Sequence, residues 1–304
     1  KVVMKESSQT LNEVVVVGYG TQKKESVVGS VQMVKPDELK VPSSQLSTGF
    51  AGRLAGVVAV QRSGEPGADG ADFWIRGIST FNGTRSPLII IDGVQASSGD
   101  LNAIDPEVIE SFSVLKDATA TALYGSRGAN GVVQVTTKRA TTGGSSFDAS
   151  VKFGISQLQK GNLEMMNGAE YYDYLVTAYT NAGTLQDQQW LQPYLKEQNF
   201  DWWDFATQNA LTQNYNIGYK YGNDRIKSYI SADYYTEEGA IKGYDYDRFT
   251  LRVNTDYIVN DRLTLRAKLS TSYKETFDQQ YGLSHTSYTP WDTPYDSQGN
   301  IKIG

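Results

Sequence analysis

Long stretches in the second half of the chain alternate apolar and polar residues with a period of two. They cover residues 147–156, 211–221, 248–257 and 263–274, with a weaker case at 226–236. Each stretch has one apolar and one polar face, as in a β-strand. A soluble sheet with one buried face would give the same period. However, strands that cross a bilayer need about 9–11 residues, whereas soluble strands average about 5–6, so the lengths favour membrane strands.

The connections between these stretches differ in length. Residues 222–225 and 259–262 form tight turns, whereas residues 237–244 form a longer connection. Outer-membrane barrels have this asymmetry, with short turns on one side and long loops on the other. The longest connection, 158–209, contains a predicted helix, because Asn167 and Glu170 form a capping box and Gly183 supplies a stop.

Composition supports strands and excludes several classes of site. The chain has 29 Gly, 20 Tyr, no cysteine and a single histidine, His285. Without further His or Cys we expect no metal site, no thiol nucleophile and no disulfide. A net charge of −6 argues against nucleic-acid binding. Gly18 and Gly20 begin a GxGxxG-like pattern, but Lys23 replaces its third glycine. We therefore predict no catalytic residues and no cofactor.

The N-terminal half has the texture of a compact α+β domain. We expect short helices over residues 46–54, after Asp105, and over 118–124, and strands over 57–61, 88–91 and 132–137. Asp92-Gly93 favours a tight hairpin turn. The predicted organisation is a tether with the end of an N-terminal extension at 1–24, a domain at 25–139, a linker at 140–146 and long strands from 147 to 304.

Four segments in order resemble one family. Residues 12–23, NEVVVVGYGTQK, are similar to a TonB box. FWIRG at 73–77, PLIIIDGV at 87–94, and LKDA at 115–118 with YGSRGANGV at 124–132 resemble the plug domain of SusC/RagA-like TonB-dependent outer-membrane transporters. The resemblance implies a membrane β-barrel of roughly 22 strands with an N-terminal α+β plug domain. About five strands are present here, and an open edge in lipid leaves backbone groups unpaired, so we expect a truncated chain.

The same resemblance implies a function and partners. It implies active import of oligosaccharide or peptide nutrients across the outer membrane of a Gram-negative, Bacteroidetes-type bacterium, without chemistry on the cargo. The implied partners are the periplasmic domain of TonB, a SusD-like surface lipoprotein and outer-membrane lipid. The sequence does not indicate which cargo is carried.

Candidate functional residues follow from these segments. An extended β-branched segment can pair with a partner by strand addition, which suits a TonB box at Glu13, Val14, Val15, Val16 and Val17. A buried strand is the structural alternative. Arg76 and Arg127 are candidates for plug-to-barrel contacts or for static pairing within the plug. Candidate cargo contacts lie in two loop regions and comprise Trp74, Thr80, Phe81, Asn82, Arg85, Trp202 and Trp203.

One reading of a different class stays open. A soluble β-rich protein that binds or hydrolyses glycans could stack Trp202 and Trp203 on sugars, and hydrolysis would need a close pair of carboxylates. The requirement for detergent separates this reading from the transporter.

Overall fold

The computed structural model describes residues 14–17, 20–23, 31–41, 43–75, 77, 86–116, 122–162, 164–278, 288–296 and 298–300. Its contacts divide the chain into two compact units. The first comprises residues 1–154, 212–237 and 246–276, and the second comprises 155–211, 238–245 and 277–304. No described helix is long and apolar enough to span a membrane.

The first unit contains a mixed five-stranded sheet, which we call the N-terminal domain together with the segments packed on it. The strands lie in the order β3-β8-β9-β6-β7. Only β6 and β9 pair in parallel. The strands are β3 (Val31–Val34), β6 (Leu88–Ile91), β7 (Val94–Ala96), β8 (Ile109–Leu115) and β9 (Val132–Thr137). The strands expected at 88–91 and 132–137 are confirmed.

An apolar core holds this domain together. Phe112 and Phe50 are fully buried, and the Phe50 ring packs edge-on against Phe73 at 5.0 Å between centroids. Burial of each such ring contributes about 1.5–3 kcal/mol. Phe73 comes from β5 (Ala71–Ile75), which forms a hairpin with β4 (Val57–Gln61) as expected.

The helices of this domain are shorter than the sequence suggests. The helix expected over 46–54 is a 3₁₀ turn, η3 (Leu46–Phe50), because Gly52 adopts a left-handed φ of 70° and ends it. After Asp105 there is only the 3₁₀ turn η4 (Pro106–Val108). The helix expected at 118–124 falls mostly outside the described residues. The remaining elements are η2 (Pro36–Leu39), α1 (Ser98–Asn102) and η5 (Ala122–Gly128).

The hairpin turn after β6 is confirmed. Asp92 and Gly93 both have positive φ, 52° and 86°, which matches the right-handed twist of the flanking strands. The buried Asp92 carboxylate accepts hydrogen bonds from the backbone N–H and the hydroxyl of Thr137, at 2.9 and 2.6 Å. These bonds stabilise an aspartate in a region of φ that most side chains avoid.

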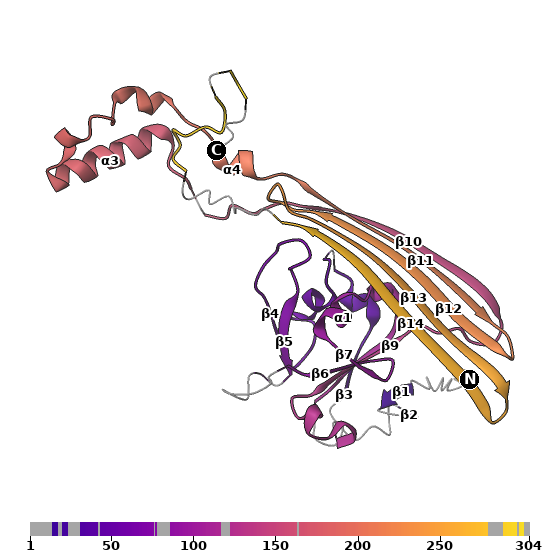
Figure 1. Cartoon of the computed structure of the whole chain (residues 1–304). Coiled ribbons are helices and arrows are strands. Elements are labelled where there is room, and N and C mark those ends of the chain that lie inside the picture. Colours follow the sequence, from indigo (N-terminus) through magenta and orange to yellow (C-terminus); the bar gives the residue numbers. More distant parts are fainter. Residues whose placement is uncertain are drawn as a thin grey trace, which may run out of the picture. The chain divides into compact units, whose positions relative to one another are not determined.

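Five long strands form a second sheet, the long sheet, in simple antiparallel order β10 to β14. They run side by side as a curved ribbon (Figure 1). Each has 13 to 16 residues, so the predicted length is confirmed. The first begins at Gly144, within the segment expected as a linker. The strands are β10 (Gly144–Ser156), β11 (Ala210–Gly222), β12 (Ile226–Glu238), β13 (Asp245–Asn260) and β14 (Leu263–Phe277).

The long sheet buries its polar face and exposes its apolar face. On β11 the polar Asn214 and Asn216 are buried, whereas the apolar Ile217 is 51% exposed. The same holds on β13, where Arg248 is 3% exposed and Phe249 is 45% exposed. A soluble sheet buries its apolar face. Here the polar face packs against protein and the apolar face is open, as in the wall of a membrane barrel.

The second unit is built around α3 (Gly168–Ala182). The predicted capping box is confirmed, since Asn167 and Glu170 each cap the other's backbone N–H, and Gly183 ends the helix with φ of 69°. The unit also contains η6 (Leu185–Asp187), η7 (Pro193–Glu197) and α4 (Trp202–Ala206).

Near the N-terminus, β1 (Val14–Val17) and β2 (Gly20–Lys23) form a two-stranded antiparallel sheet. This sheet has no further strand among the described residues.

Candidate functional site

Arg248 on β13 is the centre of the contact between the long sheet and the N-terminal domain. Its Nη1 donates to the backbone oxygen of Ser44 at 2.5 Å and to that of Asn102 at 3.3 Å. Its Nη2 lies 3.5 Å from the carboxylate of Asp233 on β12, and both side chains are at most 5% exposed. The guanidinium also lies 5.4 Å from the centre of the Tyr235 ring. One side chain of the sheet therefore holds two separate segments of the domain.

The domain segments that bind Arg248 are held in place by hydrogen bonds within the domain itself. The hydroxyls of Ser43 and Ser44 both donate to the carboxylate of Asp69, at 2.5 Å each. Asn102 donates from Nδ2 to the Gln45 side chain at 2.7 Å and accepts at Oδ1 from the backbone N–H of Ser47. Hydrogen bonds within the domain thus hold the segments that carry the two carbonyls, which favours a fixed geometry of the bonds to Arg248.

Asn214 on β11 adds a second link. Its Nδ2 donates to the carboxylate of Asp105 in the domain at 3.1 Å and to that of Asp233 at 2.8 Å. Because Asp233 also faces Arg248, the three strands β11, β12 and β13 share one polar network with the domain.

Glu107 makes the third link, through two lysines. Its carboxylate lies 3.0 Å from Lys40 of the domain and 3.0 Å from Lys152 of β10. Burial raises the pKa of Glu107, but the hydrogen bonds to both lysines outweigh burial and bring the pKa below its usual value. For Lys40, burial lowers the pKa, and the bonds to Asp37 and Glu107 outweigh it, so the pKa is raised.

Two further contacts lie along β13 and β14. Asn254 donates to the Thr137 hydroxyl at 2.8 Å and to the backbone oxygen of Lys138 at 3.2 Å. Lys268 donates to the backbone oxygen of Asp92 at 2.5 Å. The polar face of the long sheet therefore contacts the domain at several positions along its strands.

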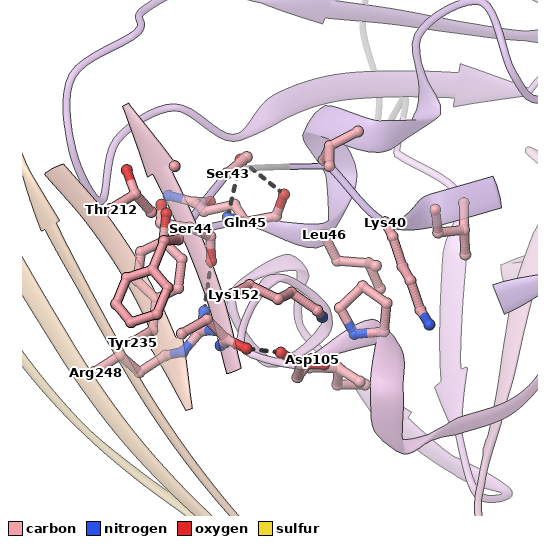
Figure 2. A pocket seen from close by; sticks show the side chains of 17 residues that line it. Lys40, Ser43, Ser44, Gln45, Leu46, Asp105, Lys152, Thr212, Tyr235 and Arg248 are labelled. Atoms are coloured by element: carbon pink, nitrogen blue, oxygen red, sulfur yellow. Dashed lines mark hydrogen bonds between the residues drawn. The ribbon is translucent and has the colours of Figure 1, made fainter. Parts of the chain in front are cut away.

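A cavity of about 250 Å³ opens beside this network. Figure 2 shows Arg248 and Tyr235 of the long sheet around it together with Ser43, Ser44 and Asp105 of the domain, with Ser44 beside Tyr235. Its lining contains no cysteine or histidine, and the structurally described part of the chain has no cluster of three acidic, His or Cys residues suited to a metal ion. The arrangement is a set of polar contacts between the long sheet and the N-terminal domain.

The predicted TonB box is described in part. Val14–Val17 form β1, and in its register Val15 pairs with Gln22 and Val16 with Thr21. Glu13 lies outside the described residues.

Of the two predicted arginines, one lies within the described residues. Arg76 lies outside the described residues. Arg127 is exposed and donates to the Gln95 side chain at 2.8 Å, within the N-terminal domain. The role of Arg127 as a plug-to-barrel contact or as a static pairing within the plug stays a prediction.

The candidate cargo contacts lie in both units. Trp74 on β5 is partly exposed and lines a cavity of about 320 Å³ with Asn102 and Gln45. Thr80, Phe81, Asn82, Arg85 and also His285 lie outside the described residues.

The tandem tryptophans belong to the second unit. Trp202 is 9% exposed; its ring stacks on Tyr288 at 4.5 Å, and its Nε1 donates to the backbone oxygen of Thr289. Lys160 lies 5.9 Å above the ring of Trp203. Both line a small pocket of about 120 Å³ together with two methionines. The role of Trp202 and Trp203 in binding cargo stays a prediction.

The sequence did not single out the residues of the fastening network. Arg248 and Asn214 fall on the polar faces of the predicted strands, as the alternation requires. A charged residue in the middle of a polar strand face was the available signal. The alternation could not show that this face is buried against the domain rather than exposed to solvent.

Comparisons with known proteins agree with this geometry. Residues 23–132 match the model of the TonB-dependent receptor plug domain. The chain is 36% identical over 286 residues to the TonB-dependent receptor P26 of Formosa agariphila, which covers 91% of this chain. It is also 36% identical over 267 residues to the TonB-dependent receptor SusC of Bacteroides thetaiotaomicron, which covers 83%. The chain spans 28% and 25% of the length of these relatives.

Solved structures show the same fold. The RagAB peptide importer in its open-open state superposes with a TM-score of 0.81 and 28% identity, over 95% of this chain and 36% of that one. In its closed-closed state the TM-score is 0.75 with 27% identity, over 91% of this chain and 35% of the importer chain. The predicted fold class is confirmed, and the N-terminal domain is the plug domain. The chain belongs to the SusC/RagA-like TonB-dependent transporters and contains their plug domain and the first strands of their barrel.

Proposed function

We propose that this chain is part of an importer that takes up oligosaccharide or peptide nutrients across the outer membrane with energy supplied through TonB. The observation that carries the proposal is the polar network of Arg248, Asp233 and Asn214. It fastens the plug domain to the strands through hydrogen bonds and ion pairs, beside an apolar contact in which Tyr229 of β12 joins the plug core. Polar contacts of this kind can be exchanged for water at lower cost than a packed apolar core.

The coupling to TonB is assigned to Glu13–Val17. β1 is extended, and one edge pairs with β2 while the other has no partner strand in the described part of the chain. A partner strand could add to that edge through backbone hydrogen bonds. A pull on this segment would be transmitted toward β3, the edge strand of the plug sheet.

The remaining partners follow from the same family. The exposed apolar face of the long sheet suits outer-membrane lipid in a Gram-negative, Bacteroidetes-type bacterium. A SusD-like surface lipoprotein would cover the outer side. One relative is named for SusC and one solved neighbour is a peptide importer, so both glycans and peptides remain cargo classes. Trp74, Thr80, Phe81, Asn82, Arg85, Trp202 and Trp203 are the proposed contacts. No chemistry on the cargo is proposed, since the relatives are named receptors and importers.

The test is deletion of residues 12–20 from the full-length gene, followed by measurement of nutrient-dependent growth and uptake. We expect uptake to be lost while the amount of protein in the outer membrane is unchanged. Unchanged uptake would refute the TonB-box assignment.

A sharper version replaces single residues. Val15→Pro and Val16→Pro each remove one backbone donor, and alternate donors of a strand point to opposite edges. One of the two variants should therefore lose TonB binding in a pull-down, while Val15→Ala and Val16→Ala retain it. Equal binding by all four variants would exclude strand addition.

A further inference from the structure

A second cavity lies between the plug domain and the long sheet, apart from the Arg248 network. Its volume is about 310 Å³, at the lower end of the range of small-molecule pockets. Its charged lining comprises Arg252 of β13, Lys268 of β14, and Asp92 and Asp100 of the plug domain. Thr250, Ser270 and Ser272 add hydroxyls, and Ile91, Val94 and Leu269 add apolar surface, so the cavity is mixed in character and accommodates about one residue of a larger ligand.

Arg252 is the unusual member of this lining. It is 7% exposed, its Nε has no hydrogen-bond partner, as is also true of Arg248, and its guanidinium makes no hydrogen bond to any described residue. None of the ion pairs formed among the described residues includes it. By contrast Arg248, four residues earlier on the same strand face, is bonded to two carbonyls and paired with Asp233. Burial of a guanidinium that has no hydrogen-bonding or ion-pair partner costs free energy. An anion bound at Arg252 would offset that cost.

The two carboxylates that line the cavity are already engaged. Asp92 accepts from the backbone N–H and hydroxyl of Thr137, and Arg139 lies 3.9 Å from it. Asp100 accepts from the backbone N–H and hydroxyl of Ser97 in the capping box of α1. Lys268 already donates to the backbone oxygen of Asp92. The cavity therefore presents two cations without an ion-pair partner among the described residues: Arg252, and Lys268, which donates to a neutral carbonyl.

We propose that Arg252 and this cavity form a binding site for a carboxylate of the cargo, carried either by an acidic residue of a peptide or by an acidic sugar of a glycan. A planar guanidinium matches a carboxylate in shape and binds it with two parallel hydrogen bonds. The site lies on the polar interface between plug and strands that cargo meets as the plug is displaced. The inference rests on the proposed importer function, but carboxylate binding is measured without transport.

The test uses the full-length protein in detergent at constant ionic strength. Calorimetric titrations with N-acetylglutamate and glucuronate compare the wild type with the Arg252→Gln and Arg252→Lys variants. Arg266→Gln is the matched control, because Arg266 is an exposed arginine of β14 paired with Asp256. We expect Arg252→Gln to weaken carboxylate binding about tenfold or more, while the control binds as the wild type does. The tighter of the two ligands identifies the cargo class.

A crystal soaked in 4-bromobenzoate, an aryl bromide that does not alkylate the protein, locates the site directly. An anomalous bromine peak beside Arg252 in the wild type, absent from Arg252→Gln and retained in Arg266→Gln, would support the proposal. It is overturned if Arg252→Gln binds both ligands as the wild type does. It is also overturned if chloride displaces the two carboxylate ligands at an equal concentration, which means an adventitious ion only. It is also overturned if Arg252 pairs with a carboxylate of the protein itself in the full-length structure. If uptake depends on residues 12–20 while carboxylates do not bind, the importer proposal stands and this one fails.

Discussion

Replacement of Arg248 by methionine tests the fastening of the plug most directly. Methionine keeps the apolar stem and removes the charge, so it deletes both hydrogen bonds to the carbonyls of Ser44 and Asn102. It also leaves the buried carboxylate of Asp233 with Asn214 as its remaining hydrogen-bond donor. Removal of one partner of a buried ion pair costs about 3–5 kcal/mol. We expect the free energy that holds the plug segments to the strands to fall by this amount.

Hydrogen–deuterium exchange on the full-length protein in detergent measures this change locally. A loss of about 3–5 kcal/mol corresponds to roughly 150-fold to 4,500-fold faster exchange, when exchange follows the local opening equilibrium. The faster peptides should be those that contain residues 43–47 and 101–104. Peptides of α3, which lies in the second unit, should keep their wild-type rates.

Two further variants make the result decisive. Arg62→Met removes an exposed ion pair with Asp72, whose side chains are 74% and 57% exposed, and should cost at most about 1 kcal/mol. The double variant Arg248→Met with Asp233→Asn removes both buried charges and should recover part of the loss. If Arg248→Met changes exchange no more than Arg62→Met does, the buried network does not hold the plug.

Three other outcomes are expected in the full-length protein. The pKa of Glu107 lies below its usual value of 4.5, so its ion pairs stabilise the fold above that pH and are lost as the pH falls through the lower, folded-state pKa. Glu107→Gln should therefore lower the melting temperature at pH 7, and the difference from the wild type should shrink toward pH 3. A difference in melting temperature that does not depend on pH would contradict this assignment. Gly67→Ala should destabilise by about 1–3 kcal/mol, because φ is +74° and the new Cβ would lie 2.3 Å from the Tyr246 ring, while Gly64→Ala has no atom within 4 Å and should be nearly neutral in denaturant unfolding. Asn167→Ala should speed exchange in the first turn of α3 by the equivalent of about 1 kcal/mol, and unchanged protection there would argue against the capping box.

The sequence alone determined features that depend on near neighbours in the chain. The period of two in 211–221 and 248–257 predicted long strands, because side chains of a strand alternate between its faces. Asp92-Gly93 predicted its turn because these residues tolerate positive φ, and Asn167 with Gly183 set the ends of α3. The order of four short motifs was enough to indicate the family.

Only the tertiary structure decided which face of the long strands is buried and what it touches. Alternation is identical for a sheet with an apolar core and for a sheet with a polar buried face, because it describes one strand at a time. The partners of Arg248 lie 204 and 146 residues away in the chain, so no local pattern could pair them. The contrast with Arg252, which has the same place on the polar face but no ion pair among the described residues, likewise depends on what packs opposite each side chain.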